Sequence, residues 1–474
     1  MKVALISAPA YSEVAFVNTF ISELLYKSET RLPPIGLLYI ASYLEKEGHE
    51  VKIFNITAFP YTIADIIEDL KQYGAQIVGF SISSNSFLLS LDIIKEVKIQ
   101  LELPIIVGGP HVTIFKEQLL NFEEINFAIP GEGEIIMADL VNAIENEGDL
   151  SKIKGLIFKD QSGNVIVNED RPVIQDLDEL LYPAYHLIDF DQYNNERFGN
   201  ERFTIGFITR GCPYNCNFCS KITKKFRTRS VDNVIKEITW LYNQFGIKNV
   251  HFWDDTFTFS KKWTLKFCNE IKKLPFKFQY SCFTRVDKID KETLQALKDS
   301  GCIQVCYGIE SFDKESLKTM NKHTTPAMIQ RAINDTIAVD MRFFSMFIFG
   351  VPGDTKQSLK NSIDFIMNTD LELIQIRPLM LMPNTQFYDD HLKKGGKDFW
   401  SEVIKGRKVK MDDVHVDSNF SKEEIDQIIR KTLLKYYLRP TKIWHLYRKK
   451  LGKFGPKMYV KGFLSILTMF FQFF

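Results

Sequence analysis

The feature of this sequence that most constrains its fold is a regular alternation of short β-rich runs with longer helical patterns over residues 1–148. Parallel strands need long connections, so strands separated by helices predict a parallel sheet that is covered by helices on both faces. Ligands of such sheets bind beyond the carboxyl ends of the strands. The predicted strands are residues 3–7, 51–56, 77–82, 105–107 and 127–129.

A second series of the same kind occupies residues 201–396. It contains six strand–helix units, fewer than the eight of a closed TIM barrel, so this region is predicted to form a partial (βα)6 TIM-like barrel. Its predicted strands lie near Ile205, Val250, Phe278, Val305, Phe344 and Ile374.

Two further regions complete the predicted organisation. Residues 149–200 contain two alternating runs around Ser162-Gly163-Asn164, which indicate a hairpin in an interdomain connector. From residue 397 to residue 474 the pattern is irregular and then helical. We therefore expect an α/β protein with a doubly wound, Rossmann-like domain of the flavodoxin type, a connector, a partial barrel and a helical C-terminal region.

The charge distribution excludes one class of partner and marks the C-terminus. The 60 basic and 59 acidic residues leave a net charge of +1, which gives no global field to attract nucleic acid. No acidic residue follows Asp426, whereas 11 basic residues lie from Arg430 to Lys461 and the apolar run FLSILTMFFQFF ends the chain. This tail has two interpretations, a helix that packs on the barrel or a peripheral contact with an anionic membrane.

The cysteines and the apolar runs indicate the cellular compartment of the protein. No stretch reaches 18 apolar residues, and the N-terminus lacks the apolar core of a signal peptide. Seven Cys without an export signal indicate free thiols or metal ligands rather than disulfides. The expected location is the cytoplasm, with or without a peripheral membrane contact.

The segment GCPYNCNFCS carries the most specific chemical signal. It places Cys212, Cys216 and Cys219 in a CxxxCxxC spacing, in the loop after the first predicted barrel strand. Cys thiolates hold iron–sulfur clusters, and three of them on a cube of four irons leave one iron open. The alternatives are a zinc site, for which we find no fourth Cys or His nearby, and three unrelated buried thiols.

This motif, with the aromatic Phe218 before its third Cys, resembles the signature of the radical S-adenosylmethionine (SAM) superfamily. The resemblance implies a 4Fe-4S cluster on the three Cys, with SAM chelating the open iron. One electron from the cluster would then cleave SAM to methionine and a 5′-deoxyadenosyl radical, which abstracts a substrate hydrogen. It also implies an external electron donor of the flavodoxin or ferredoxin type.

The segments HFWDDTFT, YGIES and FIFGVPGDT match the same superfamily in order and spacing, each after a predicted barrel strand. Alone, each would be weak, because an Asp pair often caps a helix and Gly-Pro-Gly often forms a turn. By the resemblance, Asp254 or Asp255 would contact the methionine ammonium, and Glu310 the ribose. The implied SAM-binding residues are Phe218, Asp254, Asp255, Glu310, Ser311 and Gly350.

The first domain contains neither GxGxxG after its first strand nor GxxxxGK[ST], so a dinucleotide or nucleoside triphosphate site has no support. Its candidate loops GFSISS, GGPHVT and PGEGE follow the third, fourth and fifth strands, and their glycines allow close approach to a flat ligand. With RLPPIGLLYIASYLEKEGHEV, they resemble the cobalamin-binding domain that is fused to one branch of radical SAM enzymes. The implied cobalamin-binding residues are Ser81, Ser83, Gly108, Gly109, His111, Thr113, Gly131, Glu132 and Gly133.

One departure from that family concerns the lower cobalt ligand. Many cobalamin domains supply a His from a DxHxxG motif, but the corresponding loop, residues 8–14, has neither Asp nor His. The resemblance therefore implies cobalamin held without that ligand. His111 is an alternative ligand, although a His in a Gly-Pro loop is more often a turn residue. For the domain as a whole, the alternative is a sheet that only shields the barrel.

Together these resemblances predict a cobalamin-dependent radical SAM enzyme, first of all a methyltransferase acting on an unactivated carbon or phosphorus centre of a small molecule or lipid. Such a centre has no lone pair to attack SAM, so hydrogen abstraction must come first. A cyclase, oxidative or rearranging enzyme on the same scaffold is one alternative, and a non-catalytic cobalamin-responsive protein is another. No motif identifies the substrate or a catalytic side chain.

Overall fold

The computed structural model describes residues 1–7, 32–56, 58, 61–195, 198, 201–223, 225–407, 409, 418–440 and 442. These residues group into two compact units. The first contains the described residues up to Gln192 together with those of 398–413, and the second contains those of 193–397 and from 414 onward. The loop of residues 8–14 and the tail from residue 443 lie outside the described residues.

The first unit is built on a seven-stranded sheet in the order β2-β1-β3-β4-β5-β6-β7. Strands β1 to β5 are all parallel, and the order 2-1-3-4-5 is that of flavodoxin-type doubly wound folds. The predicted fold class is confirmed for this unit. The parallel strands are β1 (Lys2–Ser7), β2 (Glu50–Asn55), β3 (Ile77–Ser81), β4 (Ile105–Gly108) and β5 (Phe127–Ile129).

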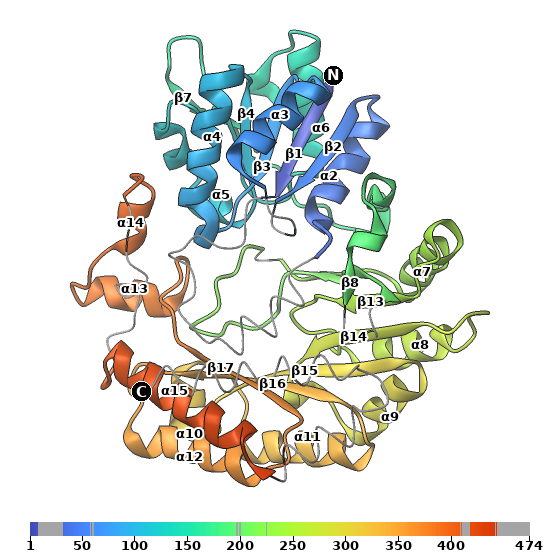
Figure 1. Ribbon diagram of the computed structural model, residues 1–474, viewed down its shortest axis with the longest axis vertical. Coiled ribbons are helices and arrows are strands. Elements are labelled where there is room, and N and C mark those ends of the chain that lie inside the picture. The colour runs from blue at the N-terminus through green and yellow to red at the C-terminus, as the bar shows by residue number, and fades with distance from the viewer. Residues whose placement is uncertain are drawn as a thin grey trace. The chain divides into compact units, whose positions relative to one another are not determined.

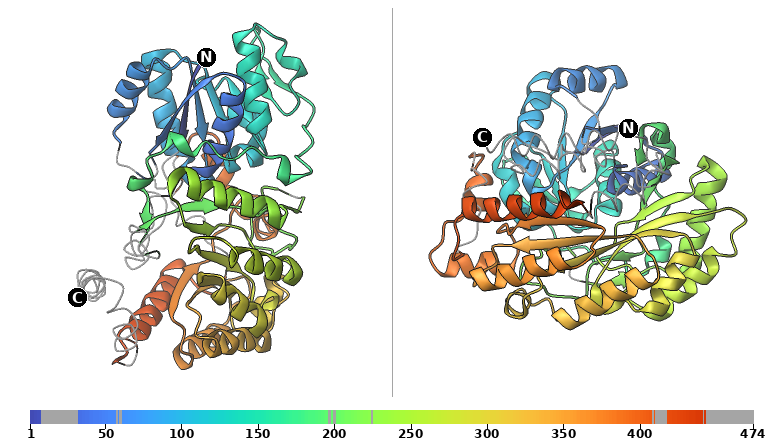
Figure 2. Two further views of the ribbon diagram at one scale, coloured as in Figure 1. Left: turned by 90° about the vertical axis from the view of Figure 1, so that its right-hand side faces the viewer. Right: turned by 60° about the horizontal axis from the view of Figure 1, so that its bottom comes forward.

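Helices cover this sheet because each has one apolar face to bury (Figures 1 and 2). Leu44 of α2 and Leu140 of α6 share one core with Val3, Ile77 and Ile106 of the strands. Helices α3 and α4 pack against each other. The helices of the unit are α2 (Ile35–Lys46), α3 (Ile63–Tyr73), α4 (Phe87–Leu101), α5 (Pro110–Phe115) and α6 (Glu134–Glu145).

The predicted hairpin exists, but it extends the first sheet. Strands β6 (Ile157–Lys159) and β7 (Val165–Val167) are antiparallel, and β6 pairs with β5 through Phe127 and Phe158. Phe158 is buried in the core of the first unit. The sequence assigned this hairpin to a connector because alternation identifies strands but not the strand edge with which they pair.

The second unit contains a six-stranded parallel sheet in the order β10-β13-β14-β15-β16-β17. Among the described strands β17 does not pair with β10, so the sheet is open, as expected for a partial (βα)6 barrel. The strands are β10 (Thr204–Gly206), β13 (Asn249–Phe252), β14 (Gln279–Thr284), β15 (Cys302–Glu310), β16 (Phe343–Phe349) and β17 (Leu373–Pro378). Two short antiparallel pairs accompany it, β8 (Asn194–Asn195) with β9 (Glu201–Arg202) and β11 (Thr209–Arg210) with β12 (Arg227–Thr228).

Helices pack on one face of this sheet in a core that includes Val250, Tyr280, Val305 and Phe347. Cys268, Cys282 and Cys302 lie in the same core. The helices between the strands are α7 (Val231–Phe245), α8 (Lys261–Ile271), α9 (Lys291–Asp299), α10 (Lys314–Thr319), α11 (Pro326–Ala338) and α12 (Lys356–Asn368).

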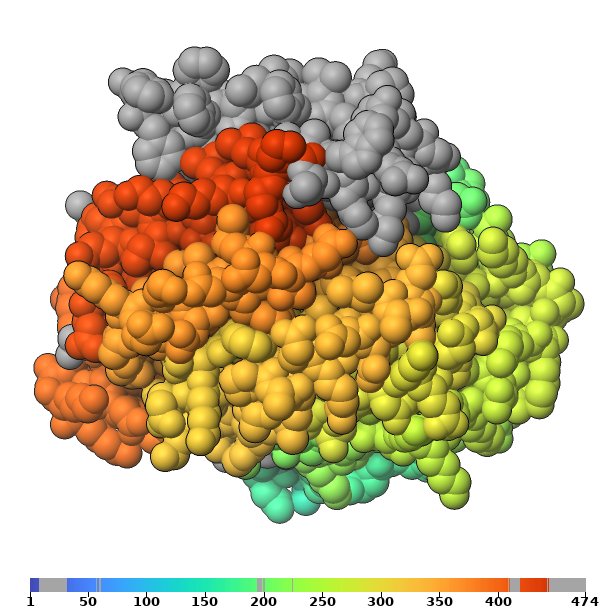
Figure 3. Space-filling view, turned by 90° about the horizontal axis from the view of Figure 1, so that it is seen from below, coloured from blue at the N-terminus to red at the C-terminus, as the bar shows by residue number. Residues whose placement is uncertain are grey.

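The C-terminal region is helical where it is described, with α13 (Gln386–Lys393), α14 (Phe399–Val403) and α15 (Lys422–Tyr437). Helix α14 groups with the first unit. Helix α15 buries Ile429 and Leu433, and it lies beside α12 on the face seen in Figure 3. The start of the basic block therefore packs on the barrel. In the described part of the chain, no helix has the length and apolar character needed to span a membrane.

Candidate active site

The three predicted cluster ligands lie in one loop that is closed at its base. Strands β11 and β12 pair through Thr209 and Thr228. The loop between the two strands, residues 211–226, therefore begins and ends at the same point of the fold. Asn217 anchors the loop at its centre, because its backbone N–H donates to Met320 O at 2.9 Å and its side-chain amide donates to Thr319 O at 2.8 Å. The backbone that carries the cysteines is thereby positioned before any ligand binds.

The three cysteines of this loop are free thiols. Cys212 and Cys216 are half-buried, and Cys219 is exposed. Desolvation by the surrounding protein raises the pKa of Cys212 and raises that of Cys219 to about 12, and the negative charge of Asp255 acts in the same direction on both. Cationic iron stabilises thiolates, so binding of a metal here would release protons.

The three thiols have the chemistry of iron–sulfur cluster ligands. Among the residues that the structure describes, no three His, Cys, Asp or Glu side chains are arranged as ligands of one ion. In an iron–sulfur cube each thiolate binds a different iron, so the three sulfurs do not have to converge on one point. Three free thiols on one anchored loop meet that requirement and leave the fourth iron open.

Glu310 lies at an irregular point of β15. Its φ is +67°, in the left-handed region, where the pairing of β15 with β16 shifts register. Its carboxylate accepts a hydrogen bond from Lys322 Nζ at 2.9 Å, and both side chains are buried. A Cβ on Gly308 would lie 2.6 Å from Glu310 Oε1, so a larger residue there would displace this carboxylate. A strained backbone that is stabilised by its surroundings is typical of functional sites.

The structure separates the roles of the two adjacent aspartates. Asp254 is buried, and its Oδ1 accepts from Ile208 N at 2.9 Å and from both the N and Oγ1 of Thr209 at 2.6 Å. Burial raises its pKa to about 7, against the effect of these bonds. Asp255 is exposed and acts electrostatically on the cysteine loop. Asp254 thus orders the start of the loop, whereas Asp255 lies near the cysteines and keeps an exposed surface.

The remaining predicted SAM-binding residues differ in accessibility. Phe218 is half-buried, and Lys322 Nζ lies 5.6 Å from the centre of its ring. Ser311 is buried, and its Oγ accepts from Asp313 N at 3.1 Å at the start of α10. Gly350 N donates to Asp354 Oδ2 at 3.1 Å. Ser311 and Gly350 therefore belong to loops that are held internally.

In the first unit, the predicted cobalamin-binding residues gather at the carboxyl ends of β3, β4 and β5. Gly109 has a φ of +98°, and a Cβ there would lie 2.9 Å from the backbone N and O of Ile82. Thr113 joins two of the loops, because its Oγ1 donates to Gly109 O at 3.0 Å and accepts from Gly131 N at 2.9 Å. Thr113, Gly131 and Glu132 also line a pocket of about 190 Å³.

Not every predicted cobalamin-binding residue faces this pocket. Ser83 shares a hydrogen bond of 2.9 Å with Ser86, next to the first turn of α4. His111 is fully buried, with its ring 4.3 Å from that of Phe87 and its Nδ1 3.0 Å from Ser84 Oγ. The buried imidazole supports the loop from inside.

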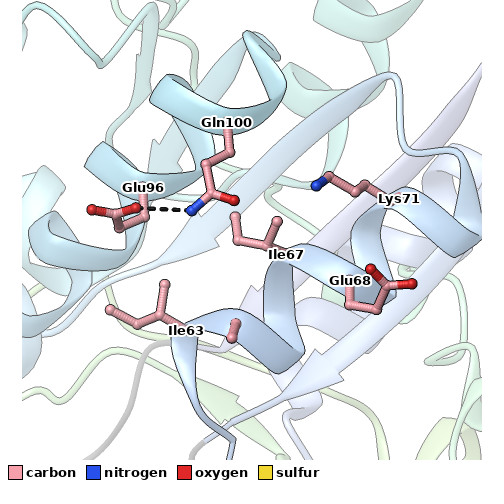
Figure 4. A pocket seen from close by; sticks show the side chains of 7 residues that line it. Ile63, Ile67, Glu68, Lys71, Glu96 and Gln100 are labelled. Carbon is pink, nitrogen blue, oxygen red and sulfur yellow. Dashed lines mark hydrogen bonds between the residues drawn. The ribbon is translucent and has the colours of Figure 1, made fainter.

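A second pocket, of about 410 Å³, lies between α3 and α4 (Figure 4). Ile63 and Ile67 face it, and Gln100 donates a 3.0 Å hydrogen bond to Glu96 at its rim. None of the predicted site residues lines this pocket, so we assign the pocket no role in the chemistry.

Sequence reasoning missed several residues that organise the site. Lys322 and Arg285 lie beside the cysteine loop, and Asp354 holds the loop after β16. Asp354 belongs to the segment FIFGVPGDT, so the motif itself could have indicated that this residue is part of the site. Lys322 and Arg285 lie outside any motif, and only the fold brings them to the site.

The fold and this site define a radical SAM enzyme with a cobalamin-binding domain, and comparison with known proteins gives the same class. Residues 207–366 match the family model of the radical SAM superfamily, and residues 22–141 match that of the B12 binding domain. The chain is 31% identical over 415 residues to an uncharacterized methyltransferase of Pyrococcus horikoshii, and the match covers 86% of this chain and 88% of that protein. The chain therefore belongs to the family of cobalamin-dependent radical SAM enzymes, whose cofactors are a 4Fe-4S cluster, SAM and cobalamin.

Two further similarities show the range of this family. The chain is 28% identical over 342 residues to the anaerobic magnesium-protoporphyrin IX monomethyl ester cyclase of Cereibacter sphaeroides, covering 70% of this chain and 55% of that protein. It also shares its fold with the radical SAM methyltransferase TsrM of Kitasatospora setae, solved with cobalamin and a 4Fe-4S cluster bound. That match has a TM-score of 0.65 at 19% identity and covers 83% of this chain and 75% of that one.

Proposed function

We propose that this protein transfers a methyl group from SAM to an unactivated carbon or phosphorus centre of a small molecule or lipid. The observation that carries the proposal is the anchored loop with its three free thiols, Cys212, Cys216 and Cys219, in a chain that also has a flavodoxin-type sheet with glycine loops. The cofactors supply the radical and methyl chemistry when they are bound. The chain's own residues bind and orient them and exclude water.

In this proposal the exposed and the buried residues of the second unit have different roles. The three thiolates hold the cluster, and Phe218 packs beside it. Asp255 contacts the SAM ammonium, because its neighbour Asp254 already accepts bonds from Ile208 and Thr209. Glu310 contacts the ribose from the position in which Lys322 holds it.

Two further residues act through the backbone. Gly350 presents the loop that receives the adenine, and Ser311 fixes the start of α10 beside Glu310.

The first unit binds cobalamin through the loops at the carboxyl ends of its strands. Close backbone approach is provided by Gly108, Gly109, Gly131 and Gly133, and polar contacts by Ser81, Ser83, Thr113 and Glu132. His111 supports these loops and does not bind cobalt, since its ring is fully buried. Cobalamin would therefore be held by the glycine loops and their polar side chains and not by this imidazole.

We place methyl transfer first because one methyltransferase relative is matched over most of its own length, 88%. Other methylases and cyclases are matched over similar shares of theirs, 63–65% and 61–62%. The match to the cyclase of Cereibacter sphaeroides covers 55% of that protein. A ring-forming or rearranging reaction is the second candidate.

The proposal includes two partners. SAM cleavage consumes one electron, so a flavodoxin- or ferredoxin-type protein is the expected donor. If the acceptor is a lipid, the basic and apolar residues from 443 to 474 would bring the enzyme to an anionic membrane surface. Otherwise the enzyme works in the cytoplasm on a small molecule.

The test is an anaerobic incubation of the reconstituted enzyme with cobalamin, SAM, a reductant and an extract of the host cell. Mass spectrometry quantifies 5′-deoxyadenosine and S-adenosylhomocysteine. We expect both products, in amounts that depend on the extract, and neither from the Cys219→Ala variant. Deoxyadenosine without S-adenosylhomocysteine would reject methyl transfer in favour of cyclisation or rearrangement.

A further inference from the structure

Two buried cations flank the cysteine loop, and the proposed binding roles leave one of them without a function. The guanidinium of Arg285, directly after β14, lies 3.8 Å from the ring centre of Tyr214. The ammonium of Lys322, after α10, lies 5.6 Å from the ring centre of Phe218. Tyr214 and Phe218 each stand between two of the cysteines in the motif. Each of these two aromatic residues thus has a cation over its ring, an arrangement that stabilises both groups.

The guanidinium of Arg285 is held in one orientation. Its Nε donates to Asp287 Oδ1 at 2.8 Å, and its Nη2 donates to the backbone O of Lys322 at 2.6 Å. The group is planar, so fixing these two nitrogens and stacking the plane on Tyr214 also fixes the third. That third nitrogen, Nη1, points at Cys216 Sγ from 4.0 Å.

The charges around the two cations are arranged differently. The ammonium of Lys322 forms an ion pair with Glu310, with 2.9 Å between Nζ and Oε1. The net charge of that pair beside the loop is therefore zero. The carboxylate partner of Arg285, Asp287, is bound at Nε, whereas Nη1 is the nitrogen near the sulfur. Arg285 therefore directs positive charge and an N–H donor toward a cluster ligand. Its side chain is only 5% exposed, so water screens this charge little.

We propose that Arg285 is a positioning residue that raises the reduction potential of the cluster. On reduction one electron passes from a low-potential donor to the cluster, no covalent bond forms or breaks and no proton moves. The reduced cluster carries one more negative charge, which a nearby cation and a hydrogen bond to sulfur stabilise. The inference rests on the proposed function only in requiring that the cluster binds to these cysteines.

The experiment compares the full-length, anaerobically reconstituted holoenzyme with its Arg285→Gln, Arg285→Lys and Lys288→Gln variants. Lys288 is the matched control, because it is exposed and its ammonium lies 5.8 Å from the same Tyr214 ring. The reduced cluster is quantified by electron paramagnetic resonance during a redox titration with dithionite. Iron content and circular dichroism are recorded for each variant.

We expect the ratio of reduced to oxidised cluster at a fixed potential to fall about tenfold in Arg285→Gln, which for a one-electron couple corresponds to a midpoint lower by about 59 mV. Arg285→Lys keeps the positive charge but loses the planar guanidinium with its fixed N–H donors. The ratio of reduced to oxidised cluster should therefore fall by about threefold in this variant. Lys288→Gln should titrate like the wild type.

A wild-type midpoint in Arg285→Gln with full iron content would overturn the proposal. If Arg285→Gln does not retain iron, Arg285→Lys decides, because an unshifted midpoint there would also overturn it. Failure of methyl transfer is distinguishable from failure of this inference, because a cyclase or rearranging enzyme would still hold the cluster and show the shift in Arg285→Gln. A wild type that holds no cluster would reject both.

Discussion

His111 shows how burial determines what a single residue can do. Its ring lies 4.3 Å from that of Phe87 and 4.6 Å from that of Phe115, and none of it is exposed. Burial lowers its pKa to about 3, because charge in this apolar environment has no water to stabilise it. The imidazole is therefore neutral in the folded protein at physiological pH.

This burial predicts a pH dependence of stability. The pKa of His111 in the folded state lies below the unfolded value of about 6.5, so its contribution is fully present above pH 6.5 and is lost as the pH falls toward 3. Between pH 7 and pH 5.5 the wild type should lose about 1 kcal/mol more free energy of unfolding than His111→Phe does. Urea unfolding of the cofactor-free protein measures this. His186→Phe, which replaces an exposed His, is the control, and equal pH dependence of wild type and His111→Phe would contradict the assignment.

Asp354 is the residue that we expect to contribute most to the structure of the loop after β16. Its carboxylate accepts from Gly350 N at 3.1 Å, Val351 N at 2.9 Å, Ser316 Oγ at 2.6 Å and Ser358 Oγ at 2.9 Å. In Asp354→Ala these four donors lose their acceptor, which should lower the free energy of unfolding by at least about 2 kcal/mol. The affinity for SAM should also fall, by roughly tenfold, or about 1.4 kcal/mol.

Calorimetric SAM binding to the anaerobic holoenzyme and denaturant unfolding measure these two effects. The control is Asp364→Ala, in the helix α12 that follows Asp354, where the carboxylate is half exposed and pairs with Lys360. Unchanged SAM affinity in Asp354→Ala would show that the loop does not need this anchor.

Single residues of the site were predictable to the extent that a short motif contains them. The sequence places Cys212, Cys216 and Cys219 close together, because they lie in one short segment, and the resemblance predicts their role. The sequence could not choose between Asp254 and Asp255, since the difference depends on the backbone of Ile208 and Thr209, more than 40 residues away.

At the scale of elements, α15 closes one edge of the barrel sheet. The hydroxyl of Tyr437 accepts from Ile374 N and donates to Ile374 O, both at 2.9 Å, and so it satisfies backbone groups of the edge strand β17. Unpaired groups at a sheet edge are prone to pair with other chains. The helix thus protects the edge that an open barrel leaves.

Removing this hydroxyl should therefore destabilise the second unit. Tyr437→Phe keeps the buried ring but leaves two backbone groups unsatisfied, at an expected cost of about 1–3 kcal/mol in the free energy of unfolding. Tyr242→Phe, at a position that is 37% exposed, should have almost no effect. Chemical denaturation of both variants tests this, and equal stabilities would argue against a role for α15 at the edge.

Elements were easier to predict than their pairing. Apolar periodicity is a local property, so the strands of the first sheet were located to within a residue of β1 to β5. The partner of the hairpin was not predictable, because the pairing of Phe158 with Phe127 depends on which sheet edge is free. The same is true of Tyr437 and β17.

At the scale of the whole molecule, the two strand–helix series predicted two sheets correctly. No sequence pattern indicated that the described residues of 398–413 group with the first unit. Their position depends on contacts across nearly 300 residues, such as that of Gly406, whose Cβ position would lie 3.3 Å from Phe122. A local sequence pattern cannot predict such long-range contacts.

The central claim is that this one chain holds a cluster with an open iron together with cobalamin. The most direct measurement is the electron paramagnetic resonance spectrum of the reduced holoenzyme with and without SAM, recorded with the iron and cobalamin content of the wild type and Cys219→Ala. We predict about four irons per chain and a SAM-dependent change of the cluster signal in the wild type, and retention of cobalamin but not of that change in Cys219→Ala. A wild-type signal that does not respond to SAM, or a response that survives in Cys219→Ala, would contradict the account.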